Sequence, residues 1–233
     1  AVYEVAEDYE DTQFFISSSD RTAQASNYKN ISGILADGVQ QGFIMGAAAG
    51  YIAQQQGSTK VAAVGGLAIP AITTTIQGYE LGVAYVDPKI EVLSAYTGDF
   101  TDINKLKEQA ITFINQGATV VMSTANAATR GGFEATKAEG GVSIGANATG
   151  LMADFKDNLA LSVNNSMQVA MTTIVGYYLK DNFKADNYIS GLNEGVITYD
   201  MSTTQPQMVK VKAQVQVVID DIKSGKINVT DLY

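Results

Sequence analysis

The chain has 233 residues, 46% of them hydrophobic and 17% charged, so it can bury a substantial core and is not a disordered polypeptide. A formal net charge of −9 repels polyphosphates and argues against a nucleic-acid partner. The absence of Cys excludes disulfides and thiolate nucleophiles, and the absence of His removes the commonest general base and transition-metal ligand. Carboxylates and lysines remain, so an enzyme is disfavoured but not forbidden. We expect that the protein is not an enzyme and binds no cofactor.

The first half of the chain alternates short apolar runs with helical patterns. Runs typical of strands, bounded by turn-forming residues, cover 12–18, 30–36, 60–66 and 89–98. Helical patterns cover 40–56 and 69–86, where Pro70 suits the first turn. Asp102 can cap a further helix that stops at Gly117.

The second half continues in the same way. Strands are predicted at 118–124, 141–147, 159–164 and 195–201, and helices at 131–139, 166–179 and 208–223. Alternation at this spacing predicts an α/β fold with a parallel sheet covered by helices on both faces. In such sheets the ligand lies beyond the carboxyl ends of the strands.

Candidate ligand-binding residues are therefore those at the strand ends. Phe100 lies where an exposed ring could stack on a flat ligand. Asp37, Asn126 and Asn147 suit hydrogen bonds to a neutral polar molecule, although Asn is also a common turn residue. The other strand-end segments are Ser17–Asp20, Gly65–Gly66 and Gly98–Asp99.

Other motifs favour structural over chemical roles. Gly65–Gly66 lacks the spacing of a dinucleotide fingerprint and the Lys of a phosphate loop, so a tight strand-to-helix turn is favoured. The acidic residues Asp8, Glu10 and Asp11 are interpreted as solvated surface. Asp99 and Asp102 are interpreted as one exposed carboxylate and one helix cap. No catalytic constellation stands out.

The run VGGLAIPAITTTIQGYELGVAYVDPKIEVLSAYTGDFTDINKLKEQA, from Val64 to Ala110, resembles the basic membrane protein family. These are lipoprotein substrate-binding components of ABC-type importers, and several bind purine nucleosides. The resemblance extends over essentially the whole chain. Its motif residues here are Gly65–Gly66, Pro70, Gly78–Tyr79, Gly82, Asp87–Pro88, Tyr96, Phe100 and Asp102, with Asp99 in place of the usual Ser.

The resemblance implies a type I periplasmic-binding-protein fold, in which two α/β lobes close on a ligand. It places an incomplete N-lobe at 1–36 and 148–195, the C-lobe at 37–147, and a C-terminal crossover and helix at 196–233. By this resemblance Phe100 stacks on the base, and Asp37 matches an acidic residue that contacts it. Asn126 or Ala127 falls near a glycine of the sugar site, and Asn147 and Asn165 fall where the family has an Asp and a Lys that contact the sugar.

Two departures from the family pattern stand out. Replacing both the Asp and the Lys by Asn keeps the site neutral but weakens the case for ribose. The chain also starts without an initiator Met, a signal peptide, the lipid-attachment Cys or the family's first strand–helix units. We therefore expect either a fragment that pairs with an upstream part or a reduced branch of the family.

The expected function is that of an extracytoplasmic solute-binding protein, lipid-anchored or periplasmic, with the anchor outside this chain. It would bind a nucleoside-like ligand as a monomer and deliver it to a membrane ABC permease. A ligand-sensing regulatory module of the same fold is the alternative. A nucleoside-processing enzyme is a third, for which only Asp37 and Asp99 could supply an acid or base.

Overall fold

The computed structural model describes residues 2–18, 28–180 and 183–232. The chain divides into two compact units. The smaller unit comprises residues 1–37 and 165–198, and the larger unit comprises residues 38–164 and 199–233. The chain therefore passes between them at three points.

The larger unit contains a six-stranded sheet in the order β4-β3-β5-β6-β7-β9. Its strands are β3 (Lys60–Gly65), β4 (Glu91–Tyr96), β5 (Val120–Thr124), β6 (Val142–Ala146), β7 (Leu159–Asn165) and β9 (Ile197–Met201). The pairs from β4 through to β7 are parallel, as the sequence predicts. The last strand, β9, is antiparallel to β7, because Ser202 N donates to Ala160 O while Ser166 N donates to Val196 O.

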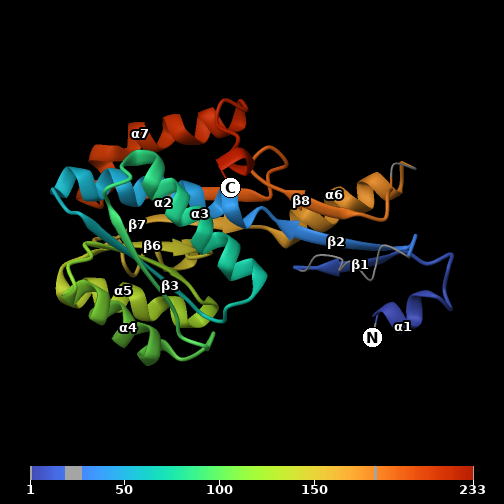
Figure 1. Ribbon diagram of the computed structural model, residues 1–233, viewed down its shortest axis with the longest axis horizontal. Coiled ribbons are helices and arrows are strands. Elements are labelled where there is room, and N and C mark those ends of the chain that lie inside the picture. Colours follow the sequence, from blue (N-terminus) through green and yellow to red (C-terminus); the bar gives the residue numbers. More distant parts are fainter. Residues whose placement is uncertain (1, 19–27, 181–182, 233) are drawn as a thin grey trace. The chain divides into compact units, whose positions relative to one another are not determined.

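Helices cover both faces of this sheet (Figure 1). On one face lie α4 (Ile103–Asn115) and α5 (Thr129–Glu139), whose apolar side chains pack on β3 and β5. On the other face lie α2 (Gly38–Gln56), α3 (Pro70–Val86) and α7 (Pro206–Lys223). The strands β3, β5 and β6 are almost entirely buried, which explains their continuous apolar sequences.

The helices α2 and α3 pack closely because glycines line their interface. A Cβ atom built on Gly46 would lie 2.0 Å from the carbonyl oxygen of Tyr79, and one on Gly82 would lie 2.2 Å from that of Phe43. Only a residue without a side chain allows the two backbones to approach so closely. The small residues of the segment 43–53 are thus explained by helix packing, with twelve buried residues in α2.

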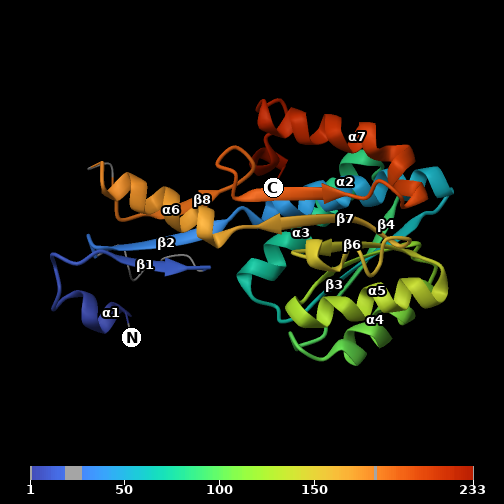
Figure 2. The ribbon, with the colours of Figure 1, turned by 180° about the vertical axis from the view of Figure 1, so that it is seen from behind.

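The smaller unit contains the three-stranded parallel sheet β1-β2-β8 (Figure 2). Its strands are β1 (Phe14–Ser17), β2 (Ile31–Ala36) and β8 (Asn187–Ser190). The helix α6 (Met167–Tyr178) packs on one face around Ile34 and Ile174. The helix α1 (Val2–Ala6) packs on the other face around Ile31.

The predicted helices and strands within the described residues are confirmed, with ends that shift by a few residues. The sequence did not reveal α1, which is five residues long and precedes an acidic stretch, or β8, a four-residue strand. Short 3₁₀ helices at Asn126–Ala128, Thr149–Leu151 and Val229–Leu232 complete the fold. Among the described residues, none of the helices combines the length and apolarity needed to cross a membrane.

Candidate ligand-binding site

Backbone hydrogen bonds tie together the carboxyl ends of three neighbouring strands in the larger unit. The amide of Gly66, after β3, donates to Thr124 O at 3.1 Å, and the amide of Gly98, after β4, donates to Gly66 O at 3.0 Å. The amide of Ala128 donates to Phe100 O at 3.0 Å. The turns that follow β3, β4 and β5 are therefore held to one another, which favours a preformed platform at this edge of the sheet.

The ring of Phe100 packs directly on Gly66. A Cβ atom built on Gly66 would lie 2.4 and 2.6 Å from two carbons of this ring and 2.9 Å from Asp99 O. At Gly65, a Cβ atom would meet the side chains of Ile72 and Ile76 in α3. The glycine pair is thus a close-packing device: Gly65 admits the following helix, and the aromatic ring fills the room that Gly66 leaves. Phe100 is partly buried rather than fully exposed.

Asn126 and Asn147 share an unusual backbone conformation. Each follows a strand of the sheet, is exposed, and has a positive φ, 47° for Asn126 and 55° for Asn147. Non-glycine residues seldom adopt this left-handed conformation, and Asn tolerates it best. Ser18, after β1 in the smaller unit, has a φ of 58°. Strained backbone of this kind is concentrated at binding sites, so Asn126, Asn147 and Ser18 are candidates for mutational tests of ligand binding.

Asp99 is engaged by its own turn. Its Oδ1 accepts hydrogen bonds from the amide and hydroxyl of Thr101 and from the amide of Asp102, the last at 2.9 Å. The bond from the Thr101 amide contributes most to lowering the pKa of this carboxyl below its ordinary value. Asp99 is therefore a poor proton acceptor at neutral pH. Asp102 caps α4 through a 3.0 Å bond from the Lys105 amide, as predicted.

The structure distributes the five candidate residues between the units. It brings Phe100 and the Asn126 turn together through the Ala128 amide, and it places Asn147 directly after β6, the next strand of the same sheet. Asp37 and Asn165 belong to the smaller unit. The amide of Asp37, after β2, donates to Ser190 O at 2.9 Å, and Asn165 is the last residue of β7.

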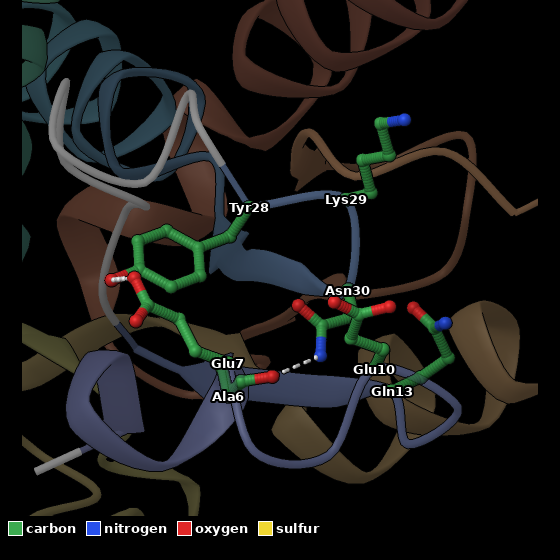
Figure 3. Close-up of a pocket in the computed structure, with 7 residues that line it drawn as sticks. All are labelled: Ala6, Glu7, Glu10, Gln13, Tyr28, Lys29 and Asn30. Atoms are coloured by element: carbon green, nitrogen blue, oxygen red, sulfur yellow. Dashed lines mark hydrogen bonds between the residues drawn. The ribbon is translucent and has the colours of Figure 1, made fainter.

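The smaller unit has a separate pocket of about 510 Å³ beside α1 (Figure 3). Glu7 in this pocket accepts a hydrogen bond from the Tyr28 hydroxyl at 3.0 Å. Asn30 donates to Ala6 O at 2.9 Å and to two further carbonyls of the same segment, so it serves to anchor the N-terminal backbone.

Asp8, Glu10 and Asp11 are exposed, as the sequence predicts. Within the described ranges, no group of acidic residues is arranged to hold a metal ion.

Solved structures share this fold. A solute-binding protein of an ABC transporter system from Aeropyrum pernix K1 superposes with a TM-score of 0.75 over 97% of this chain and 73% of its own, at 22% identity. A transcriptional activator of the comK gene from Bacillus halodurans also gives 0.75, over 94% and 73%, at 18% identity. The architecture and the strand-end platform thus define an α/β protein of the periplasmic-binding-protein fold.

The sequence places the chain more narrowly. Residues 1–231 match the family described as ABC transporter substrate-binding protein PnrA-like, and the chain belongs to this family. Basic membrane protein B of Borreliella burgdorferi is 31% identical over 165 residues, 68% of this chain and 47% of that protein. Basic membrane protein A of Borreliella afzelii is 27% identical over 186 residues, 77% of this chain and 55% of that protein. The chain spans about half the length of these curated relatives.

Proposed function

We propose that this protein is an extracytoplasmic solute-binding component of an ABC-type importer and that its ligand is a small, neutral, ring-containing molecule of the purine nucleoside class. The observation that carries the proposal is the platform formed by the linked turns after β3, β4 and β5. It holds Phe100, whose ring is partly buried, and the left-handed Asn126 at one edge of the sheet. Membership of a substrate-binding family supports the same assignment.

The chemistry of the platform favours binding over catalysis. The amide group of Asn can donate and accept hydrogen bonds, which suits the hydroxyl and carbonyl groups of a neutral ligand. Asp99, one of two carboxylates considered as a catalytic acid or base, is occupied by Thr101 and Asp102. Its lowered pKa makes it unsuited to general-base catalysis near neutral pH. We therefore assign no catalytic role to it.

The proposed ligand contacts are specific. Phe100 stacks on the planar ring system, and Asn126 and Asn147 bind polar groups of the ligand. Asp37 and Asn165 are proposed as further ligand-binding residues. Asn147 and Asn165 stand where the resemblance to the family implies an Asp and a Lys. In the proposal these two amides bind a neutral polar group of the ligand. In the proposed cycle, the liganded protein delivers the molecule to a membrane permease.

Calorimetric titration with inosine, guanosine and adenosine, alongside ribose and amino acids, tests this proposal. In urea unfolding of the same protein, a nucleoside at 100 times its dissociation constant should raise the free energy of unfolding by about 2.7 kcal/mol. The substitution Phe100→Ala should weaken binding by about 1–3 kcal/mol if the ring stacks on the base. Tyr85→Ala removes a ring that is 46% exposed, near the C-terminal end of α3, and should leave affinity unchanged. Saturable binding that is indifferent to Phe100→Ala would refute the stacking assignment.

A ligand-sensing regulatory module is the second candidate. It is favoured by the fold similarity to a transcriptional activator, which matches this chain as well as the transport protein does by TM-score. Both candidates require ligand binding, so the titration does not separate them. Genes for a permease and an ATPase alongside this one would support import, whereas a gene for a kinase or receptor would support sensing.

A further inference from the structure

A cluster of polar side chains lies beside the turn that carries Asn147. The carboxylate of Asp200, on β9, accepts hydrogen bonds from the hydroxyl of Thr149 and, at 3.1 Å, from the side-chain amide of Asn164 on β7. The same amide nitrogen of Asn164 donates to Thr149 Oγ1 at 2.7 Å. Its carbonyl oxygen accepts a bond from the hydroxyl of Ser162 at 2.8 Å.

This cluster reaches the backbone of the turn through Ser162. Ser162 is fully buried, and its Oγ accepts a hydrogen bond from the amide of Ala148 at 2.8 Å. The amide of Asn147 donates to Val163 O at 3.0 Å. Consecutive amides of the turn are thus bonded to β7. Since Asn147 has a φ of 55°, these bonds help to hold a backbone conformation that is unfavourable by itself.

We propose that Asp200 is a positioning residue for the ligand site: it fixes Thr149 and Asn164, and thereby holds the turn that presents Asn147. The inference rests on the proposed function, because that function assigns Asn147 to the ligand. A carboxylate fits this position because both of its partners donate to it. Both bonds end on the same oxygen, Oδ2, so an amide oxygen can take its place, whereas an alanine side chain leaves both donors without this acceptor.

Exchange of the Ala148 amide hydrogen, followed by NMR on the ligand-free protein, tests the positioning role directly. Asp200→Ala should raise this exchange rate by about 3- to 10-fold, the effect of losing roughly one hydrogen bond. Thr149→Val, which removes the hydroxyl at nearly constant volume, should act in the same direction. Asp200→Asn keeps an oxygen acceptor for both donors and should leave the rate close to that of the wild type.

The affinity for the nucleoside that binds best should follow the exchange rate. We expect Asp200→Ala to weaken binding by about 3- to 10-fold and Asp200→Asn to retain most of the affinity. Asp221→Ala is the matched control: it breaks a 2.8 Å ion pair with Lys226 at the end of α7. Because neither residue takes part in the hydrogen bonds that link Asp200 to the turn, its loss should leave both the exchange of Ala148 and the affinity unchanged.

The outcomes separate this inference from the function on which it rests. Unchanged exchange of Ala148 in Asp200→Ala overturns the inference whether or not a ligand binds. Faster exchange with unchanged affinity overturns the link to the ligand site. If the wild type binds none of the nucleosides, the proposed function fails, and the inferred link to the ligand fails with it. Faster exchange and weaker binding in Asp200→Ala, with near-wild-type values in Asp200→Asn, together support it.

Discussion

The contact between Gly66 and Phe100 allows the strand-end platform to be perturbed without touching a polar group. In Gly66→Ala, the new Cβ atom would lie 2.4 and 2.6 Å from two ring carbons and 2.9 Å from Asp99 O. Ordinary contacts of this kind are about 3.5–4.0 Å, so the ring must move by roughly 1 Å or more. Overpacking of this size should lower the free energy of unfolding by about 1–3 kcal/mol.

Displacement of the ring should also weaken ligand binding. If Phe100 stacks on a purine, loss of the aligned ring costs up to about 1–3 kcal/mol of binding free energy. Urea denaturation measures the stability of each variant, and calorimetric titration measures its affinity. Gly176→Ala is the control, because a Cβ atom there, in the last turn of α6, meets nothing within 4 Å. That change should be neutral or should stabilise the helix by up to about 1 kcal/mol.

A double-mutant cycle decides whether the ring is the cause. In the Phe100→Ala background most of the clash is gone, so Gly66→Ala should cost clearly less stability than it does in the wild type. Strict additivity of the two changes would refute the packing argument. Full stability and full affinity in the single variant Gly66→Ala would refute the claim that this contact shapes the platform.

Further predictions concern helix packing, pH and ligand choice. Gly46→Ala forces a methyl group against the Tyr79 carbonyl and should destabilise the fold by about 1–3 kcal/mol or more, measured by urea unfolding. Asp99→Asn should be destabilising at neutral pH, because the folded state lowers the pKa of Asp99 below its unfolded value of about 3.9. The ionised carboxylate therefore stabilises the folded state at pH values above the unfolded pKa. This contribution is lost as the pH falls through the folded pKa. Its stability difference from the wild type should therefore vanish in acid. Asn147→Asp with Asn165→Lys should raise ribonucleoside affinity in titrations, and no gain would count against a sugar site there.

The sequence predicts the fold well because its signals are local and repeated. Continuous apolar runs such as 60–66 and 118–124 end in turn residues, and each indeed forms a parallel strand buried on both sides. The direction of β9 was missed, since a short apolar run does not indicate which way its strand pairs. The strand β8 was missed as well, because Asn187–Ser190 has too few residues to show a period.

The site is only partly readable from the sequence. Asn after a strand is a recognisable signal for the left-handed backbone found at Asn126 and Asn147. The Ala128 amide that holds Phe100, and the carboxylate of Asp200 beside Thr149, carry no sequence signal. Both depend on contacts between segments far apart in the chain, and residue type alone does not specify such contacts.

The central claim, that a ligand binds at the carboxyl ends of the strands, is tested most directly by hydrogen–deuterium exchange with and without a saturating nucleoside. The account predicts protection in the larger unit at the turns 66–67, 98–101, 125–128 and 147–149. The exchange rates of amides on the exposed face of α7 should be the same with and without the nucleoside. Protection confined to other segments, or no protection with a nucleoside that demonstrably binds, would contradict it.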